Sequence, residues 1–371
     1  MHNAAMDAVT AGDGQEGLAG LADGVLRSLD RYLYRARQYG LTATLAIPGR
    51  LLGLLMSPGQ GGIDSHVVGL LQQRYEALLE RDLANVEQGI YPRELLYQLP
   101  LLSYLRQLPA AVGDLPRFLW RSFTEQHDDL PAHVDRSRYP RYYLRTFHWQ
   151  TDGWLSDRSA RLYDASVEFL FAGTADIMRR MAIPPLVAAL RGVAHPRVLD
   201  VACGTGRFLL QLNRALPQAK LYGLDLSAPY LAHAATLLAG CDASLVNDNA
   251  EAMPWAAGSF DAVASVFLFH ELPADARRRV AREALRVLKP GGRLVVCDSA
   301  QLADSGDLEP VLHRFPATYH EPYFKGYLRD DIAALLSDVG FTVESSEPYL
   351  VSKVVVARRP NRAVRRGTAR R

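Results

Sequence analysis

The second half of the chain alternates short apolar, β-branched runs with segments of helical periodicity, and this alternation constrains the fold more than any other feature. Seven runs after Pro196 have the length and composition of strands: 197–202, 220–224, 243–246, 260–266, 292–298, 341–348 and 353–357. Helical segments lie between them at 207–216, 228–239, 275–288 and 329–339. This order predicts a doubly wound, mainly parallel α/β sheet. Only a short turn separates the last two runs, which predicts an antiparallel hairpin at the sheet edge.

The first half, from about Leu18 to Arg191, shows helical spacing and no run typical of a strand. Residues 164–181 have the pattern of one amphipathic helix, and Pro184 and Pro185 begin another that reaches Leu190. We therefore predict four segments along the chain. They are a disordered N-terminus (1–24), an α-helical substrate or cap domain (25–191), the seven-stranded α/β domain (192–357) and an Arg-rich tail (358–371).

Composition and charge restrict the class of function. Hydrophobic residues make up 49% of the chain and charged residues 22%, so the chain can bury a large core. The chain has 42 Lys and Arg and 40 Asp and Glu, and its last fourteen residues hold seven Arg and no acidic residue. Without these seven, 35 basic side chains face 40 acidic ones, so the rest of the chain is mildly acidic. An acidic body argues against a broad nucleic-acid surface, and we interpret the tail as a solvated, disordered end.

The cysteines and the apolar stretches predict a cytoplasmic protein. Three cysteines without CxxC spacing form no disulfide framework or zinc knuckle, which fits a reducing compartment. Residues 1–24 lack the pattern of a secretory signal. The most apolar stretch, Leu41–Met56, is interrupted at Pro48 and is shorter than the roughly 20 residues of a spanning helix. We expect no transmembrane segment.

The strongest local signal is a glycine turn between the first strand and its helix. Gly204 and Gly206 allow the backbone to approach a ligand closely, at the point where a helix N-terminus presents free N–H groups. Asp225, at the end of the second strand, is placed to accept hydrogen bonds from a ribose diol. A nicotinamide or flavin site is disfavoured because Leu209 occupies the third glycine position of the dinucleotide fingerprint. The acidic Asp200 before the turn suits a ligand with a sulfonium and an amino acid group instead.

Together with three further motifs, these residues resemble the class I S-adenosylmethionine-dependent methyltransferases, particularly the ubiquinone/menaquinone-biosynthesis-like branch. The resemblance covers about residues 196–358 and rests on five motifs in order, which begin at Asp200, Asp225, Asn249, Phe260 and Leu288. It implies a seven-stranded Rossmann-like sheet with S-adenosylmethionine across the carboxyl ends of the first strands. It also implies an enzyme that transfers a methyl group by in-line displacement.

The resemblance assigns the cofactor contacts by position. The glycine turn would surround the methionine part, Asp225 would hold the ribose, and Phe267 would lie near the methyl group. The full set is Asp200, Ala202, Cys203, Gly204, Thr205, Gly206, Asp225, Leu226, Asp248, Asn249, Ala250 and Phe267. Two positions depart from the family pattern: Ala202 replaces the first glycine of D-x-G-x-G-x-G, and Asn249 replaces a frequent aspartate.

The segment after the fourth strand supplies the catalytic candidates. His270 has a side chain suited to deprotonating or orienting an acceptor, and Glu271 to neutralising charge. The alternative is that His270 only closes the strand end with hydrogen bonds. A zinc-protease helix is excluded because position 274 is Ala and Pro273 breaks the helix, and we expect no metal.

Two aromatic clusters are candidates for the acceptor pocket. One spans residues 139–154, before the α/β domain, and has His148, Trp149, Gln150 and Asp152 at its centre. The other, in the long link after the fifth strand, contributes Tyr323 and Tyr327, and in this family that link commonly forms a lid. The alternative for the first cluster is packing at a domain interface.

We therefore predict a methyltransferase that acts on a small-molecule acceptor by O-, N- or C-methylation, with the helical half as a substrate cap. One alternative is a macromolecular methyltransferase, although the segment from Phe267 to Pro273 lacks the Pro-Pro of amino-adenine and glutamine methylating enzymes. Another is a non-catalytic scaffold that only holds S-adenosylmethionine. Leu-rich helices leave self-association open.

Overall fold

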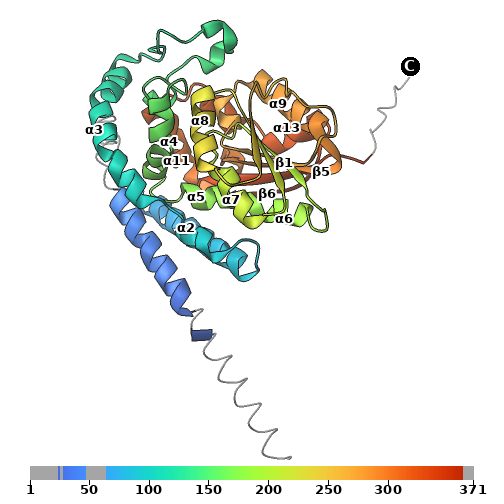
Figure 1. Ribbon diagram of the computed structural model, residues 1–371. Helices are drawn as coiled ribbons and strands as arrows, with labels where there is room; N and C mark the ends of the chain where they lie inside the picture. The colour runs from blue at the N-terminus through green and yellow to red at the C-terminus, as the bar shows by residue number, and fades with distance from the viewer. Residues whose placement is uncertain (1–23, 26–27, 47–63, 362–371) are drawn as a thin grey trace, which may run out of the picture.

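A computed structural model describes residues 24–25, 28–46 and 64–361, and its centre is a seven-stranded sheet (Figure 1). The strand order is β3-β2-β1-β4-β5-β7-β6. β1 to β5 are parallel, whereas β7 pairs antiparallel with β5 and β6. The bounds are β1 (Arg197–Val201), β2 (Lys220–Asp225), β3 (Ala243–Asn247), β4 (Phe260–Val266), β5 (Leu288–Ser299), β6 (Thr342–Tyr349) and β7 (Ser352–Arg358). The predicted α/β sheet and its antiparallel hairpin are confirmed.

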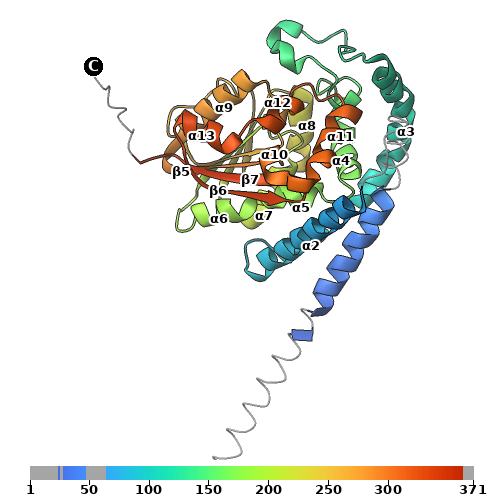
Figure 2. The ribbon, with the colours of Figure 1, turned by 180° about the vertical axis from the view of Figure 1, so that it is seen from behind.

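Helices cover both faces of this sheet, as the two views show (Figures 1 and 2). Alternate strand residues point to opposite faces, so Val198 and Ala262 join one core cluster while Leu199 and Val263 join the other. The first face packs against α6 (Ile183–Ala189), α7 (Arg207–Ala215) and α8 (Ala228–Leu237), and the second against α9 (Ala274–Val287) and α13 (Ile332–Val339).

The link between β5 and α13 is helical. It contains α10 (Leu302–Ser305), the 3-10 turn η6 (Gly306–Leu308), α11 (Glu309–Thr318) and α12 (Phe324–Arg329). A small core of its own, built on Leu312, Phe324 and Leu328, joins these helices to Ala300 at the end of β5. The predicted helix over 329–339 therefore begins later, at Ile332, where the side chain of Asp331 accepts the Ala334 N–H as an N-cap.

The described part of the first half contains helices and no strand, as the sequence predicts. A helix over 28–46 is followed by α2 (Ser65–Glu87), the 3-10 turn η1 (Arg93–Tyr97), α3 (Leu101–Thr124), α4 (Asp157–Leu170) and α5 (Ala175–Arg180). Three short 3-10 turns precede α4, namely η2 (Arg136–Arg138), η3 (Arg141–Tyr143) and η4 (Phe147–Trp149). α3 runs along the outer side of the molecule (Figure 1).

The prediction of one helix over 164–181 is wrong. α4 ends at Leu170 and α5 begins only at Ala175, because the backbone turns through left-handed conformations at Ala172 (φ 48°) and Gly173 (φ 80°). Gly173 adopts this conformation without steric cost, so it ends the helix despite the continuing apolar pattern.

The two halves of the chain share one core. Tyr34 and Leu78 from the first half belong to the same buried cluster as Val198 and Leu209 around the sheet. Within the first half, Arg180 of α5 also forms a buried ion pair with Asp82 of α2. The sheet face is therefore packed directly against helices that precede it by more than a hundred positions.

Among the described residues, none of the helices combines the length and the apolar character needed to cross a bilayer. The predictions made for residues 1–23, for the part of Leu41–Met56 after residue 46, and for 362–371 lie outside the described residues.

Candidate active site

The sheet reverses its strand order between β1 and β4, and a cavity of about 130 Å³ opens there at the carboxyl ends of the strands. Neighbouring crossover connections leave in opposite directions at such a point, so a crevice forms between the loops. The segments after β1, β2, β3 and β4 all contribute lining residues, and so do side chains of the first half.

The turn between β1 and α7 has an unusual backbone. Ala202, Gly204 and Gly206 have φ values of 60°, 53° and 79°. A Cβ atom on Gly206 would lie 3.0 Å from Cβ of Ala234, so only glycine fits there without displacing α8. Ala202 holds a conformation that costs a non-glycine residue about 1–2 kcal/mol.

Asp225 ties this turn to the end of β2. Its Oδ2 accepts the Gly204 N–H and its Oδ1 accepts the Ser227 N–H, both at 2.8 Å. Burial raises the pKa of Asp225 to about 6, although these two N–H groups favour its ionised form. Each carboxylate oxygen keeps a further lone pair, so the side chain can accept two hydroxyl groups from the cavity.

Asp200 supplies a buried carboxylate without a donor. The residue is 1% exposed, it lines the cavity, and neither of its oxygens accepts a hydrogen bond. Burial and the nearby charge of Asp225 raise the pKa of Asp200 well above its usual range. A buried carboxylate of this kind is stabilised by a cationic donor, and an amino group entering the cavity would be one.

Eleven of the twelve predicted cofactor residues line this single cavity, and Gly206 instead packs against α8. Asn249 also shapes its own loop, because its Oδ1 accepts the Glu251 N–H at 2.9 Å. The eleven are Asp200, Ala202, Cys203, Gly204, Thr205, Asp225, Leu226, Asp248, Asn249, Ala250 and Phe267.

The first half contributes an aromatic wall to the cavity, and three of its four members belong to the predicted cluster 139–154. The wall consists of Tyr142, Tyr143, Trp154 and Tyr163. Tyr142 and Tyr143 come from η3, Trp154 follows η4, and Tyr163 belongs to α4. An aromatic-rich stretch at 139–154 is visible in the sequence, but no pattern tells which of its rings face the strand ends.

Two arginines that line the cavity were missed by the sequence analysis. Arg179 and Arg207 share the buried carboxylate of Asp176, with Arg207 Nη2 at 2.5 Å from Asp176 Oδ2. The nearby Glu168 does not balance the second guanidinium, because burial and the charge of Asp176 raise its pKa to about 8. Arg179 and Arg207 therefore bring positively charged side chains to the wall of the cavity.

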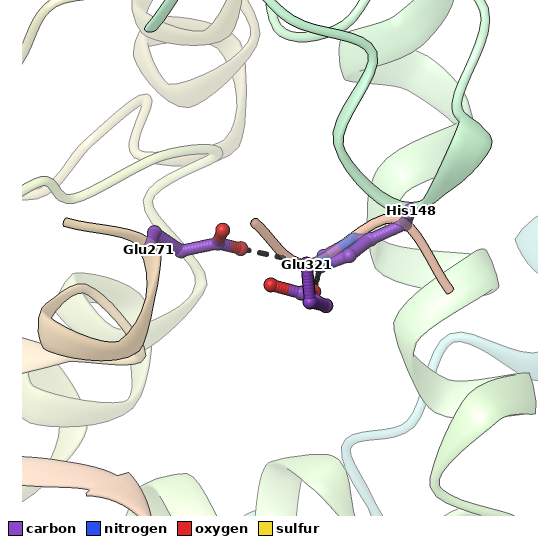
Figure 3. Close-up of side chains that lie close together, drawn as sticks. All are labelled: His148, Glu271 and Glu321. Carbon is purple, nitrogen blue, oxygen red and sulfur yellow. Dashed lines mark ion pairs between the residues drawn. The ribbon is translucent and has the colours of Figure 1, made fainter. Parts of the chain in front are cut away.

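The structure separates the two catalytic candidates. His270 is 8% exposed and does not line the cavity, and its Nδ1 lies 2.6 Å from Oδ1 of Asp298 on β5. Glu271 lines the cavity, and its Oε1 lies 3.5 Å from His270 Nε2. The same oxygen lies 3.2 Å from His148 Nε2 (Figure 3).

None of the five predicted acceptor residues lines the cavity. Trp149 donates from Nε1 to the Thr318 carbonyl at 3.2 Å, and Gln150 donates to the Tyr230 hydroxyl at 2.8 Å. Tyr327 is fully buried and donates to the Ser299 carbonyl at 2.5 Å, whereas Tyr323 packs edge-on against Tyr142. Their roles toward an acceptor stay predictions.

Comparison with known proteins agrees with this geometry. Residues 198–292 match the family model described as a methyltransferase domain. The chain is 34% identical over 182 residues to the ubiquinone/menaquinone biosynthesis C-methyltransferase UbiE of Syntrophotalea carbinolica, covering 48% of this chain and 73% of that protein. The chain belongs to the class I S-adenosylmethionine-dependent methyltransferases. A demethylmenaquinone methyltransferase of Thermotoga maritima is 32% identical over 174 residues, covering 47% of this methyltransferase and 69% of that relative.

Solved structures similar to this methyltransferase include a SAM-dependent methyltransferase from Methanosarcina mazei. It has a TM-score of 0.40 and 19% identity, and the match covers 48% of this chain and 98% of that one. A SAM dependent methyltransferase from Aquifex aeolicus gives a TM-score of 0.36 and 22% identity, with 48% and 92% covered.

Proposed function

We propose that this methyltransferase acts on a small, mainly apolar acceptor held between the strand ends and the first half of the chain. The aromatic wall carries this proposal, because its rings face the same cavity as the predicted cofactor residues. A concave site lined by aromatic side chains with a few convergent polar groups is typical of small-molecule binding. Macromolecular substrates need an open surface beside the methyl donor, whereas this cavity is lined in part by residues of η3 and α4.

The residues around the cavity fit S-adenosylmethionine. Asp200 would accept its ammonium group, Arg179 would face its carboxylate, and Asp225 would accept hydrogen bonds from its ribose hydroxyls. Leu226 and the loop containing Asn249 would hold the adenine. When bound, S-adenosylmethionine supplies an electrophilic methyl group on a positively charged sulfur.

Phe267 would orient the reacting groups from the end of β4. Its φ of 56° is rare for a bulky residue, and its N–H donates to the Cys297 carbonyl at 2.8 Å. Its ring stacks on Phe171 at 6.2 Å between centroids and an interplanar angle of 9°. A strained backbone held by its surroundings fixes the ring against the cavity and joins it to the first half.

Glu271 would orient the acceptor rather than remove a proton from it. Burial favours its neutral form, but His148 and His270 outweigh burial and lower the pKa of Glu271 to about 2. A base with so low a pKa removes protons poorly at neutral pH. His270 acts as a positioning residue, since it lies between Asp298 and Glu271 and does not reach the cavity.

Calorimetric titration with S-adenosylmethionine and with S-adenosylhomocysteine tests the cofactor site. We expect micromolar affinity, about −8 kcal/mol. Asp225→Ala should weaken it at least about tenfold, since a hydrogen bond to a charged group contributes about 1.5–3 kcal/mol. Asp338→Ala, an exposed aspartate on α13, is the matched control and should bind like the parent. Unchanged binding by Asp225→Ala would refute the assignment.

Transfer of a labelled methyl group then tests the acceptor class. Because two relatives are named for ubiquinone/menaquinone and demethylmenaquinone methylation, quinols of that type are the first small molecules to assay. We expect label in small molecules and in none of the RNA or protein samples. Label in RNA or protein alone would contradict the proposal, and the same chain with residues 358–371 removed would show whether the tail is responsible.

A further inference from the structure

Three side chains that are far apart in the sequence meet beside the cavity. His148 lies in η4, Glu271 ends η5 (Phe269–Glu271), and Glu321 lies between α11 and α12. Figure 3 shows the two carboxylates directed at the imidazole from different segments. One ligand atom from each residue lies within 4.8 Å of the other two, and His148 Nε2 is 3.2 Å from Glu271 Oε1.

The cluster is buried and incompletely paired. The Glu321 side chain is 0% exposed and forms an ion pair with His148, yet neither of its oxygens accepts a hydrogen bond. Oε2 of Glu271, whose side chain is 6% exposed, also has no donor. His148 faces both carboxylates, yet Oε2 of each stays in low dielectric without a donor, and such a position favours a further cation.

We propose that His148, Glu271 and Glu321 form a binding site for one divalent first-row metal ion, with Zn²⁺ favoured. One imidazole nitrogen and two carboxylate oxygens are ligands that Zn²⁺ accepts, and three protein ligands with an open fourth position are typical of catalytic zinc sites. A neutral imidazole with two carboxylates carries a charge of −2, which balances the ion. Tetrahedral Zn²⁺ bonds of about 2.0–2.2 Å place ligand atoms roughly 3.4 Å apart, so the cluster needs only a small contraction to hold the ion.

The site adjoins the cavity through Glu271, which belongs to both. An open coordination position on that side would take an oxygen donor of the acceptor, such as a phenol or an enol. Coordination would lower the pKa of that hydroxyl, so the acceptor oxygen would ionise without a strong protein base. This role rests on the proposed function, whereas metal binding itself does not.

Adjacent-residue motifs led the sequence analysis to expect no metal. Of such motifs, the start of a zinc-protease helix at His270 was rejected because position 274 is Ala. The proposed ligands are instead separated by 123 and 50 positions, and only the fold brings them together.

The test is calorimetric titration of the chelator-treated full chain with Zn²⁺ and, separately, Mn²⁺, without cofactor or acceptor. We expect one Zn²⁺ per chain, confirmed by elemental analysis, with weaker Mn²⁺ binding. Glu321→Gln should weaken Zn²⁺ binding at least about 100-fold, since even the outer partners of metal ligands contribute 10- to 100-fold. Glu309→Gln is the matched control, because Glu309 forms an exposed pair with His313 and should not affect the affinity.

Thermal unfolding keeps the test decisive if Glu321→Gln is destabilised. Zn²⁺ should raise the unfolding midpoint of the parent and of Glu309→Gln but not of Glu321→Gln or His148→Asn. Absence of stoichiometric Zn²⁺ and Mn²⁺ binding by the folded parent would overturn the metal site. So would equal affinity in Glu321→Gln and the parent. Because no methyl transfer is measured, failure here leaves the proposed acceptor class standing.

Discussion

Replacing Asp82 by Asn removes the charge at the most completely enclosed ion pair between α2 and α5. Asp82 is 0% exposed and Arg180 2%. The carboxylate accepts hydrogen bonds from Tyr34 and Tyr91, each at 2.5 Å, and from Arg180 Nε and Nη2 at 2.9 and 2.5 Å. An amide offers one oxygen in place of two and directs an N–H₂ group at these donors. The guanidinium then stays buried without its counter-ion.

The expected loss follows from these contacts. Removing one partner of a buried ion pair costs about 3–5 kcal/mol, mainly because the remaining charge is uncompensated. The hydrogen bonds lead to a similar value, because Arg180 donates two of them to Asp82 and each bond to a charged group contributes about 1.5–3 kcal/mol. We therefore expect Asp82→Asn to lower the free energy of unfolding by about 3–5 kcal/mol.

Equilibrium unfolding in urea, followed by circular dichroism, measures this loss. Asp275→Asn is the control, because Asp275 forms an exposed pair with Arg279 four residues later, with side chains 69% and 44% exposed. Such pairs contribute about 0.3–0.5 kcal/mol. A loss below about 1 kcal/mol in Asp82→Asn, comparable to a surface pair, would refute the reasoning that the pair is dry and essential to the packing of α2 against α5.

Three further outcomes concern the cofactor loop. Ala202→Gly should raise the free energy of unfolding by up to about 1 kcal/mol in the same urea assay, because the relief of left-handed strain at alanine exceeds the entropy cost of glycine. A lower free energy of unfolding would contradict the claim that Ala202 is strained. Gly206→Ala should lower stability by at least about 1 kcal/mol, since φ is 79° and the new Cβ would meet Ala234 at 3.0 Å; an unaltered urea midpoint would contradict this. S-adenosylmethionine affinity should fall by up to about tenfold per pH unit below pH 6, because the pKa of Asp225 is raised to about 6 and the ribose needs the ionised carboxylate. Titrations from pH 5 to 8 check this, and Asp225→Asn should remove that dependence. The effect of Asp225 on folding stability has the opposite sign. Because its pKa is higher in the folded chain than in the unfolded chain, protonation of Asp225 between about pH 6 and pH 4 increases the free energy of unfolding.

The strands and the glycine turn were predictable because their signals are local. β4 begins and ends at the predicted residues, Phe260 and Val266, and the other strands agree to within a few positions except β5. β5 begins at Leu288 rather than 292, since the backbone before its glycines continues beside β4 through the pair Phe260 and Leu288. Periodicity carries no information on such register shifts.

Which aromatic residues line the cavity was not predictable, and neither was the metal cluster, because both depend on distant contacts. Tyr163 lies on α4 and Arg179 on α5. The spacing of apolar residues indicates which face of each helix packs on the core, but not which other side chains reach the cavity. The break at Gly173, which sets the angle between those helices, is hidden by a pattern that continues across it. His148 has a left-handed backbone with φ of 54°, a conformation uncommon for a residue other than glycine, and the periodicity of the sequence does not indicate it.

The position of β7 has a consequence for synthesis on the ribosome. All the residues that line the cavity leave the ribosome before β7, yet β7 pairs between β5 and β6, inside the sheet. Until it arrives, β5 presents an unpaired apolar edge, including the fully buried Val295, Val296 and Cys297. Open edges of this kind pair with other chains. A nascent methyltransferase has therefore synthesised every residue of its cavity before its sheet is closed. During that interval the open edge of β5 exposes it to aggregation, so we expect chaperones to bind the chain until β7 has paired.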